Sequence, residues 1–133
     1  MYNIFIDGRE GTTGLQIYDR LSACDELNIL VLPEEKRKDV EARRECLNSA
    51  DICFLCLPDS AAREAVPLIE NPTVRVIDAS TAHRASEGWV YGLPEIENGR
   101  RELIAAAKRV ANPGCHATGF ITLVAPLVKS GIA

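Results

Sequence analysis

The stretch FIDGREGTTGLQI, residues 5–17, decides the fold because it connects a strand to a helix through three glycines. The preceding run, Tyr2–Asp7, is short and apolar, as expected of a strand buried in a sheet. The residues after the last glycine place apolar side chains near helical spacing. Glycines allow a tight turn, and the free N–H groups at a helix start attract phosphate. The stretch therefore predicts a dinucleotide-binding turn, a relative of the pattern G-x-G-x-x-G. Its expected cofactor-binding residues are Gly8, Gly11, Thr12, Thr13 and Gly14.

The remainder of the chain repeats the alternation of strand and helix. Further strands are expected at residues 27–32, 51–57, 74–80 and 108–112, and helices at 12–24, 36–50, 59–70, 101–107 and 117–131. This order predicts an α/β fold, a Rossmann-like doubly wound parallel sheet with helices on both faces. Five strands are expected, and the irregular stretch 81–99 is a candidate functional loop.

Length and composition are those of one globular domain. The 133 residues carry a net charge of −4, which gives no reason to expect nucleic acid or an anionic membrane as a partner. We see no signal peptide and no apolar run of the roughly 18 residues that a membrane span needs. Five cysteines, an odd number without framework spacing, indicate a reduced cytoplasmic protein.

The residues after the second strand bear on the choice of nucleotide. Glu34 and Glu35 follow the strand tip, and Lys36, Arg37 and Lys38 come next. The basic cluster favours NADP, because it would neutralise a 2′-phosphate. The same residues also fit a solvated helix start, and Glu34 could serve a ribose hydroxyl.

A cysteine lies directly after the last expected strand, in VANPGCHATG, residues 110–119. Pro113 and Gly114 break the strand, so Cys115 falls in the first turn of the following helix. The positive end of a helix stabilises a thiolate, which favours a nucleophile. The alternative is a small apolar side chain at a helix start. In a doubly wound sheet Cys115 would share the carboxyl edge of the strands with the glycine turn. A thiol near a nicotinamide indicates covalent attack on a carbonyl, followed by hydride transfer.

Four segments together resemble one enzyme family: GREGTTGLQI, VIDASTAHR, YGLPE and ANPGCHATG. They are similar to segments of N-acetyl-gamma-glutamyl-phosphate reductase, in particular its shorter, type 2 form, and they cover almost the whole chain. The resemblance implies reduction of N-acetyl-gamma-glutamyl phosphate by NADPH to N-acetylglutamate semialdehyde and phosphate, through a cysteine thioester, in arginine biosynthesis.

The resemblance also assigns roles to residues. It implies that Cys115 is the nucleophile, that Leu57, Pro58 and Ser80 flank the cofactor, and that Arg84 binds the phosphate or carboxylate of a small-molecule substrate. In this family the general acid/base is a histidine in a second domain. We expect residues 1–133 to be the NAD(P)-binding domain without that substrate and dimerisation domain, and therefore inactive alone. A homo-oligomer is expected when the second domain is present.

Neither histidine of the chain is expected to replace that base. Neighbours on a helix point about 100° apart, a poor geometry for His116 beside Cys115. His83, in the irregular stretch, is expected to be structural or solvated.

Two alternatives and one metal motif remain to be weighed. An aspartate-semialdehyde-dehydrogenase-like enzyme would share the glycine turn and cysteine, and a non-enzymatic NADP-sensing module would need only the turn. Cys53 and Cys56 form a C-x-x-C, but residues three apart on a strand face opposite sides. No metal site is therefore expected.

Overall fold

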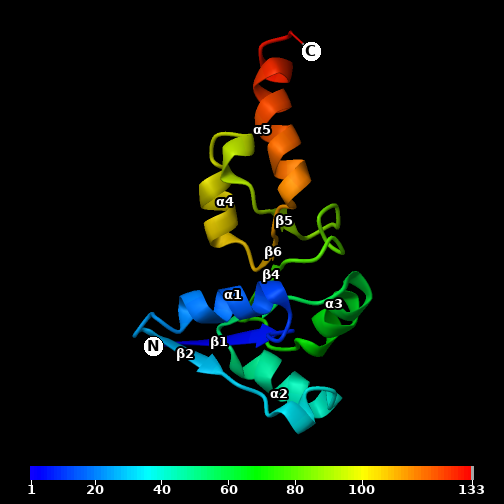
Figure 1. Cartoon of the computed structure of the whole chain (residues 1–133). Coiled ribbons are helices and arrows are strands. Elements are labelled where there is room, and N and C mark those ends of the chain that lie inside the picture. The colour runs from blue at the N-terminus through cyan, green and yellow to red at the C-terminus, as the bar shows by residue number, and fades with distance from the viewer. Residues whose placement is uncertain (133) are drawn as a thin grey trace.

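A fully parallel, six-stranded sheet organises the computed structural model, which describes residues 1–132 (Figure 1). The strand order is β2-β1-β3-β4-β6-β5. The strands are β1 (Tyr2–Asp7), β2 (Leu27–Leu30), β3 (Ile52–Leu55), β4 (Arg75–Asp78), β5 (Val90–Tyr91) and β6 (Arg109–Ala111). The doubly wound parallel sheet predicted from the sequence is thus confirmed, but the expected number of strands is wrong. The additional strand, β5, lies within the stretch 81–99 and pairs with β6 at the edge of the sheet.

Helices connect the strands and lie on both faces of the sheet. In Figure 1, α1 and α2 lie on opposite sides of the first two strands. Because β1 lies between β2 and β3, the chain passes first to one side of β1 and then to the other, which requires crossovers on opposite faces. The helices are α1 (Thr12–Leu21), α2 (Val40–Ser49), α3 (Asp59–Ala65), α4 (Arg100–Ala106) and α5 (Cys115–Lys129), with short 3₁₀ turns η1 (Glu34–Lys36), η2 (Val66–Leu68) and η3 (Pro94–Ile96).

Three helices are shorter than the sequence pattern predicts. Helix α1 ends at Leu21 instead of at residue 24, and α2 and α3 are shorter for local reasons. The side chain of Asp39 accepts hydrogen bonds from the N–H groups of Glu41 (2.9 Å) and Ala42 (3.2 Å), so α2 begins at Val40 rather than at residue 36. α3 gives way to the 3₁₀ turn η2, whose second residue is Pro67. Proline lacks the N–H that would continue the α-helical hydrogen bonds.

The main core fills the space between the sheet and the helices that follow β2 and β3. It consists of Phe5, Leu47, Ala50, Cys53, Leu55, Ala65, Val74 and Val76. In β3, Cys53 and Leu55 are fully buried while their neighbours are half-buried, as the two-residue period of a strand requires. The first four strands are thereby held in register, and their carboxyl ends form one edge.

Helix α5 differs from the others because it leaves the body of the sheet (Figure 1). It carries large apolar side chains that are exposed, among them Phe120 at 67% and Leu123 at 75%. Among the described residues, no helix combines the length and apolar character needed to cross a membrane. Single exposed apolar residues are ordinary on a protein surface, but a row of them along one helix indicates an interaction surface.

Candidate active site

The residues expected to form the site all lie at the carboxyl edge of the sheet. The glycine turn follows β1, Leu57 and Pro58 follow β3, Ser80 and Arg84 follow β4, and Cys115 follows β6. These four strands are neighbours in the order β1-β3-β4-β6. With strands about 4.8 Å apart, the tips of β1 and β6 are about 14 Å from each other. The fold therefore brings the predicted positions together along a single line of loops.

The glycine turn is packed so closely that side chains would not fit at two of its positions. Gly8 has φ of +85°, and a Cβ there would lie 2.3 Å from the backbone oxygen of Cys56. A Cβ on Gly14 would lie 2.3 Å from the oxygen of Gly8. Gly11 is the N-cap of α1, and its N–H donates to the oxygen of Gly8 at 3.1 Å. A glycine cap has no side chain to accept hydrogen bonds from the first turn of α1, so those N–H groups suit an anionic ligand.

The two threonines of the turn are the first residues of that helix. Thr12 and Thr13 are exposed, with their N–H groups in the first turn of α1. Arg9, within the turn, places its guanidinium over the ring of Tyr18, 4.1 Å from the centroid. The turn therefore presents backbone donors, two hydroxyls and a neighbouring cation, which fits a pyrophosphate.

A groove of about 620 Å³ lies beside the turn, between the ends of β1 and β2. Its lining includes Gly8 and Leu57 from the predicted set, together with apolar side chains at the end of β2 such as Leu32. A groove of this size and mixed lining is typical of sites for small molecules and cofactors. The residues present thus fit the adenosine half of a dinucleotide.

Charged side chains in this groove are largely paired with one another. Asp7, the last residue of β1, is buried, and its Oδ2 lies 2.7 Å from Nη2 of Arg43. Arg37 contacts both Glu10 (3.2 Å) and Glu34 (2.8 Å). The basic cluster predicted to neutralise a 2′-phosphate therefore has one member engaged with carboxylates.

Two of the basic residues and their acidic neighbours still line the groove. Lys38 and Glu35 are part of its lining, and Arg37 keeps about a third of its side chain exposed. A ligand phosphate would have to compete with Glu10 and Glu34 for Arg37. The preference between NAD and NADP remains a prediction.

Residues after β3 and β4 occupy the middle of the edge. Leu57 approaches the glycine turn, with its Cδ2 3.1 Å from the position of a Cβ on Gly8. Pro58 is exposed and is the N-cap of α3. Ser80 is buried, and its Oγ donates to Oδ2 of Asp78 at 2.9 Å. The hydroxyl of Ser80 thus stabilises its own loop. A contact to the cofactor would come from other atoms of Ser80.

Cys115 is the first residue of α5 and is exposed. The N-cap of this helix is Gly114, so Cys115 belongs to a first turn whose N–H groups no cap side chain engages. The expectation of a poor geometry for His116 beside Cys115 is wrong, because its Nδ1 lies 3.5 Å from Sγ of Cys115, whereas the expectation that it does not replace the family's base stays a prediction. Nδ1 is the ring nitrogen nearer the backbone, so a neighbouring side chain at a helix start reaches it in spite of the helical angle.

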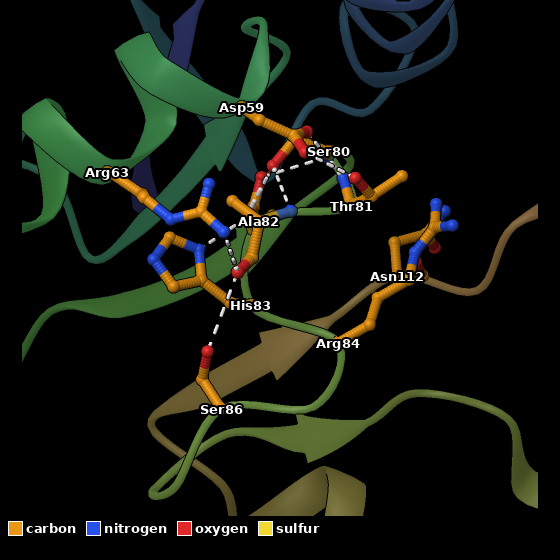
Figure 2. A network of polar contacts seen from close by, with 10 residues as sticks. Asp59, Arg63, Ser80, Thr81, Ala82, His83, Arg84, Ser86 and Asn112 are labelled. Carbon is orange, nitrogen blue, oxygen red and sulfur yellow. Dashed lines mark hydrogen bonds and ion pairs between the residues drawn. The ribbon is translucent and has the colours of Figure 1, made fainter.

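Arg84 lies next to the cysteine turn. Its Nε donates to the backbone oxygen of Asn112 at 3.2 Å (Figure 2). A Cβ added to Gly114 would lie 2.5 Å from Nη1 of Arg84. The guanidinium is therefore packed against the residue that precedes Cys115, which brings a positive charge to the turn that carries the thiol.

The loop between Ser80 and Arg84 is held by side chains on both sides. Asp78, the fully buried last residue of β4, accepts from the N–H and Oγ of Ser80, both at 2.9 Å. Nδ1 of His83 lies 2.6 Å from Oδ2 of the same carboxylate. On the other side Thr81 donates to Asp59 through its N–H (2.9 Å) and its hydroxyl (Figure 2).

His83 is therefore structural and not solvated. It is buried, and its ring stacks on Trp89 with the centroids 4.2 Å apart and the planes 11° apart.

The hydrogen bonds from Thr81 hold the pKa of Asp59 below its usual range, and Arg63 and Arg84 act in the same direction. Cations and a carboxylate thus surround the loop that carries Arg84.

Three of the other cysteines, Cys46, Cys53 and Cys56, show what a non-reactive thiol looks like in this fold. Burial raises the pKa of Cys53 to about 12, and its Sγ lies 3.4 Å from the backbone oxygen of Leu47. Burial raises the pKa of Cys56 to about 11 and also raises that of Cys46. Cys53 belongs to the core, and the described residues contain no group of three or more metal-ligating side chains.

Comparison with known proteins agrees with this geometry. Residues 3–106 match the family model described as "Semialdehyde dehydrogenase, NAD binding domain". The chain belongs to this family. The match includes the glycine turn, the groove and the loop of Arg84, and it ends before β6 and Cys115.

Relatives of this semialdehyde dehydrogenase domain with high identity carry the name that the four motifs suggest. N-acetyl-gamma-glutamyl-phosphate reductase 2 of Pseudomonas putida is 60% identical over 129 residues, which are 97% of this chain and 41% of the relative. The corresponding reductases of Chelativorans sp. and Trichormus variabilis are 60% and 54% identical over the same share of this chain. The similarity to the reductases is thereby confirmed, and the chain spans about two fifths of their length.

Solved structures place the semialdehyde dehydrogenase domain in the same fold. Aspartate semialdehyde dehydrogenase II of Vibrio cholerae superposes with a TM-score of 0.68 at 18% identity, covering 97% of this chain and 47% of that one. The enzyme of Francisella tularensis superposes with a TM-score of 0.67 at 17% identity, covering 98% and 42%. At this identity the likeness concerns the fold alone.

Sequence reasoning missed the two buried aspartates of this domain. Asp7 and Asp78 end β1 and β4, and each orients a residue of the edge, Arg43 or His83. A signal is present in the sequence: an acidic residue ends the strand directly after apolar residues in YNIFID and in RVID. Such a residue lies at the carboxyl edge, where ligands bind in this class of sheet.

Proposed function

We propose that the protein carrying this chain reduces N-acetyl-gamma-glutamyl phosphate to N-acetylglutamate semialdehyde, with NADPH as reductant and Cys115 as nucleophile, in arginine biosynthesis. The observation that carries this proposal is the position of Cys115. An exposed thiol begins α5 with Arg84 packed against the preceding glycine, on the same edge as the glycine turn. The names of relatives that are 60% identical to the chain supply the substrate.

The residues of the chain suggest how the first step proceeds. The thiolate of Cys115 attacks the acyl carbon; a carbon–sulfur bond forms and the carbon–oxygen bond to phosphate breaks. Arg84 stabilises the negative charge of the departing phosphate, and the helix start stabilises the thiolate. The product of this step is a thioester on Cys115, and the released phosphate takes up one proton from solvent.

The second step needs a hydride at the thioester carbon. The nicotinamide cofactor, when bound, supplies this hydride and is oxidised. Gly8, Gly11, Thr12, Thr13 and Gly14 would hold its pyrophosphate, and Leu57, Pro58 and Ser80 would lie along its nicotinamide half. Breaking the carbon–sulfur bond then releases the aldehyde and restores the thiolate of Cys115.

The choice of NADPH rests on the basic side chains at the groove. Lys38 and Arg37 both line it. Lys38 could contact a 2′-phosphate directly, and Arg37 could do so after it exchanges a carboxylate partner for the ligand. Replacing Lys38 by Met should then raise the KM for NADPH and leave that for NADH unchanged. Equal changes for both cofactors would exclude Lys38 as the contact to the 2′-phosphate.

The exposed apolar face of α5 supports the proposal that this domain functions as part of a larger protein. The curated relatives are more than twice as long as the chain, and α5 offers Phe120, Leu123 and Val128 as a packing surface. We expect a further domain to cover this face, to supply the general acid/base and to form a homo-oligomer. Residues 1–133 alone are expected to be inactive.

The test uses the complete natural polypeptide that contains these residues. Phosphate-dependent reduction of NADP⁺ is measured with N-acetylglutamate semialdehyde, and with aspartate semialdehyde and glyceraldehyde 3-phosphate as rivals. Activity confined to the first aldehyde and lost in Cys115→Ser supports the proposal. Activity with aspartate semialdehyde replaces the substrate and keeps the mechanism. Binding of NADPH without activity on any aldehyde indicates a cofactor-sensing module.

A further inference from the structure

We propose that Asp78 and His83 are positioning residues that fix loop 80–84 so that the guanidinium of Arg84 stays beside Cys115. The inference rests on the proposed role of Cys115, and it adds a second layer of residues behind Arg84. Arg84 follows His83 directly in the chain, so the orientation of one backbone unit determines where both side chains can reach.

The buried end is the carboxylate of Asp78, which is 0% exposed. It is the last residue of β4, a strand paired on both sides, so its backbone is fixed by the sheet. Both carboxylate oxygens are engaged by the loop: Oδ1 by the N–H of Ser80, and Oδ2 by the hydroxyl of Ser80 and the ring of His83. Moving these partners away would leave the buried carboxylate without hydrogen bonds, which costs free energy. The loop is therefore held in one conformation.

The middle of the network is the ring of His83. Its Nδ1 faces Asp78 at 2.6 Å, and its flat side stacks on Trp89, which itself packs against the main core. The ring is thus restrained in two directions, one polar and one apolar. A histidine that only filled space would need the stack but would not need the short contact to a buried carboxylate.

Independent contacts restrain the outer side of the same loop. Arg63 on α3 donates to the backbone oxygen of Ala82 at 3.1 Å, and Thr81 donates to Asp59, also on α3 (Figure 2). Thr81 and Ala82 are therefore tied to α3, while Ser80 and His83 are tied to Asp78. Arg84 is the first residue after these four that points away from the network, toward Asn112 and β6 (Figure 2).

The exposed end is the contact between Arg84 and the cysteine turn. The position of a Cβ on Gly114 would be 2.5 Å from Nη1, 3.1 Å from Cζ and 3.2 Å from Nη2 of Arg84. The whole guanidinium plane thus occupies the space that a side chain at position 114 would need. Asn112, whose oxygen accepts from Arg84, is itself bonded through its N–H to the oxygen of Asp78 at 2.8 Å. The loop and the cysteine turn therefore share Asp78 as their point of attachment.

The experiment measures the charge beside Cys115 directly. Iodoacetate and iodoacetamide both alkylate a thiolate, but only iodoacetate is an anion, so the ratio of their rates reports a nearby cation. The rates are read at the Cys115 peptide by mass spectrometry in the complete natural polypeptide, with the exposed Cys24 as internal reference. One charge at close range in a partly aqueous site changes such a ratio about three- to fivefold.

Four variants separate positioning from a general structural role. Arg84→Gln removes the charge and defines the full loss of the ratio. His83→Phe keeps a ring on Trp89 but removes the nitrogen facing Asp78, and should lose most of the same ratio. His83→Asn places an amide nitrogen near the former Nδ1 and should restore at least half of it. Ala85→Ser, at an exposed neutral neighbour of Arg84, is the control and should leave the ratio unchanged.

The same variants give a kinetic signature if the protein is a reductase. His83→Phe and Arg84→Gln should both raise the KM for the acyl phosphate about tenfold and leave the dissociation constant for NADPH within about twofold. Thermal unfolding is followed in parallel. Should His83→Phe fail to fold, Asp78→Asn is measured in its place; it keeps the shape of the side chain and removes its charge, and the ratio should again fall.

A folded His83→Phe or Asp78→Asn variant with the ratio of the wild type would overturn the inference. A fall of the alkylation ratio in His83→Asn as large as the fall in His83→Phe would also overturn it, because the contact to Asp78 would then be irrelevant. The alkylation ratio does not depend on turnover. A ratio that follows the prediction in a protein without reductase activity would therefore support the positioning role and contradict the proposed function.

Discussion

The two halves of the carboxyl edge are built by different means. At β1 the turn from Gly8 to Gly14 is held by backbone contacts, such as the bond from Gly11 N–H to the oxygen of Gly8 and the approach of Gly8 to Cys56. At β4 and β6 the loop from Ser80 to Arg84 is held by side chains, with Asp78 and Asp59 accepting most of its bonds.

The difference matches what the proposed function requires of each half. A pyrophosphate is common to all dinucleotides, so main-chain N–H groups and a close approach suffice for it, and glycine provides both. A reacting thiol and a particular substrate need charges at defined positions, which only side chains can supply. We therefore expect the nucleotide half to respond chiefly to added Cβ atoms, and the cysteine half to respond chiefly to altered functional groups.

The largest effect should come from the cysteine half, with the fold unchanged. Cys115→Ser removes the thiolate, and the complete protein should lose at least about 10³-fold in kcat. Because Cys115 is exposed, the free energy of unfolding should change by no more than about 0.5 kcal/mol. Steady-state kinetics and urea unfolding measure the two quantities. Cys24→Ser, at the other exposed thiol, is the matched control and should keep full activity. Retained activity in Cys115→Ser would remove the thiol from the mechanism.

The opposite pattern is expected in the nucleotide half. Gly8→Ala forces a Cβ to 2.3 Å from a backbone oxygen at φ of +85°, and should lower the free energy of unfolding by about 2–5 kcal/mol. Gly99→Ala is the control, because Gly99 has φ of +80° but no atom within 4 Å of its Cβ position. It should cost about 1 kcal/mol, from the backbone conformation alone. Equal losses in urea unfolding would show that close approach at Gly8 contributes nothing.

The same contrast explains how much of the molecule could be predicted from its sequence. The glycine turn and the helix after it were predicted correctly, because backbone requirements leave a local signature of glycine and spacing. The strand β5 was missed, because two residues carry no periodicity and pair only through β6, which is distant in the sequence.

Side-chain networks were the harder part. The partners of Asp78 include residues two and five positions further on, but which of them face the carboxylate depends on the path of the loop. The contact between Cys115 and His116 was judged from an ideal helix, whereas rotamers at a helix start allow it. Arg84 could be assigned only by resemblance, since its place beside Gly114 depends on the pairing of β4 with β6.

A smaller effect concerns the thiol that the fold keeps neutral. The folded pKa of Cys53 is about 12, above the value near 9.0 of an exposed thiol. The native state therefore retains this proton while the unfolded state loses it. Stability is fully present below about pH 9 and falls as pH rises toward 12, by up to about 1.4 kcal/mol per pH unit. Cys53→Ala should make this slope shallower, as measured by urea unfolding across that range, and the remainder belongs to thiols such as Cys56, whose pKa burial raises to about 11. A slope that is unchanged in Cys53→Ala would assign the alkaline loss to groups other than Cys53.

The smallest effect on stability is expected from Gly114→Ala. Together with Gly8→Ala, this variant tests the same type of substitution in both halves. The new Cβ would meet the guanidinium of Arg84 at 2.5 Å, which is the end of a flexible side chain and can move, unlike the backbone oxygen that faces Gly8. The free energy of unfolding should therefore fall by only about 0.5–1 kcal/mol, the cost of Ala in place of Gly at a helix N-cap. Displacement of Arg84 should nevertheless lower the ratio of iodoacetate to iodoacetamide rates at Cys115 about twofold. A loss of stability as large as that of Gly8→Ala would mean that Arg84 is fixed as rigidly as backbone, and the two halves would then differ in chemistry alone.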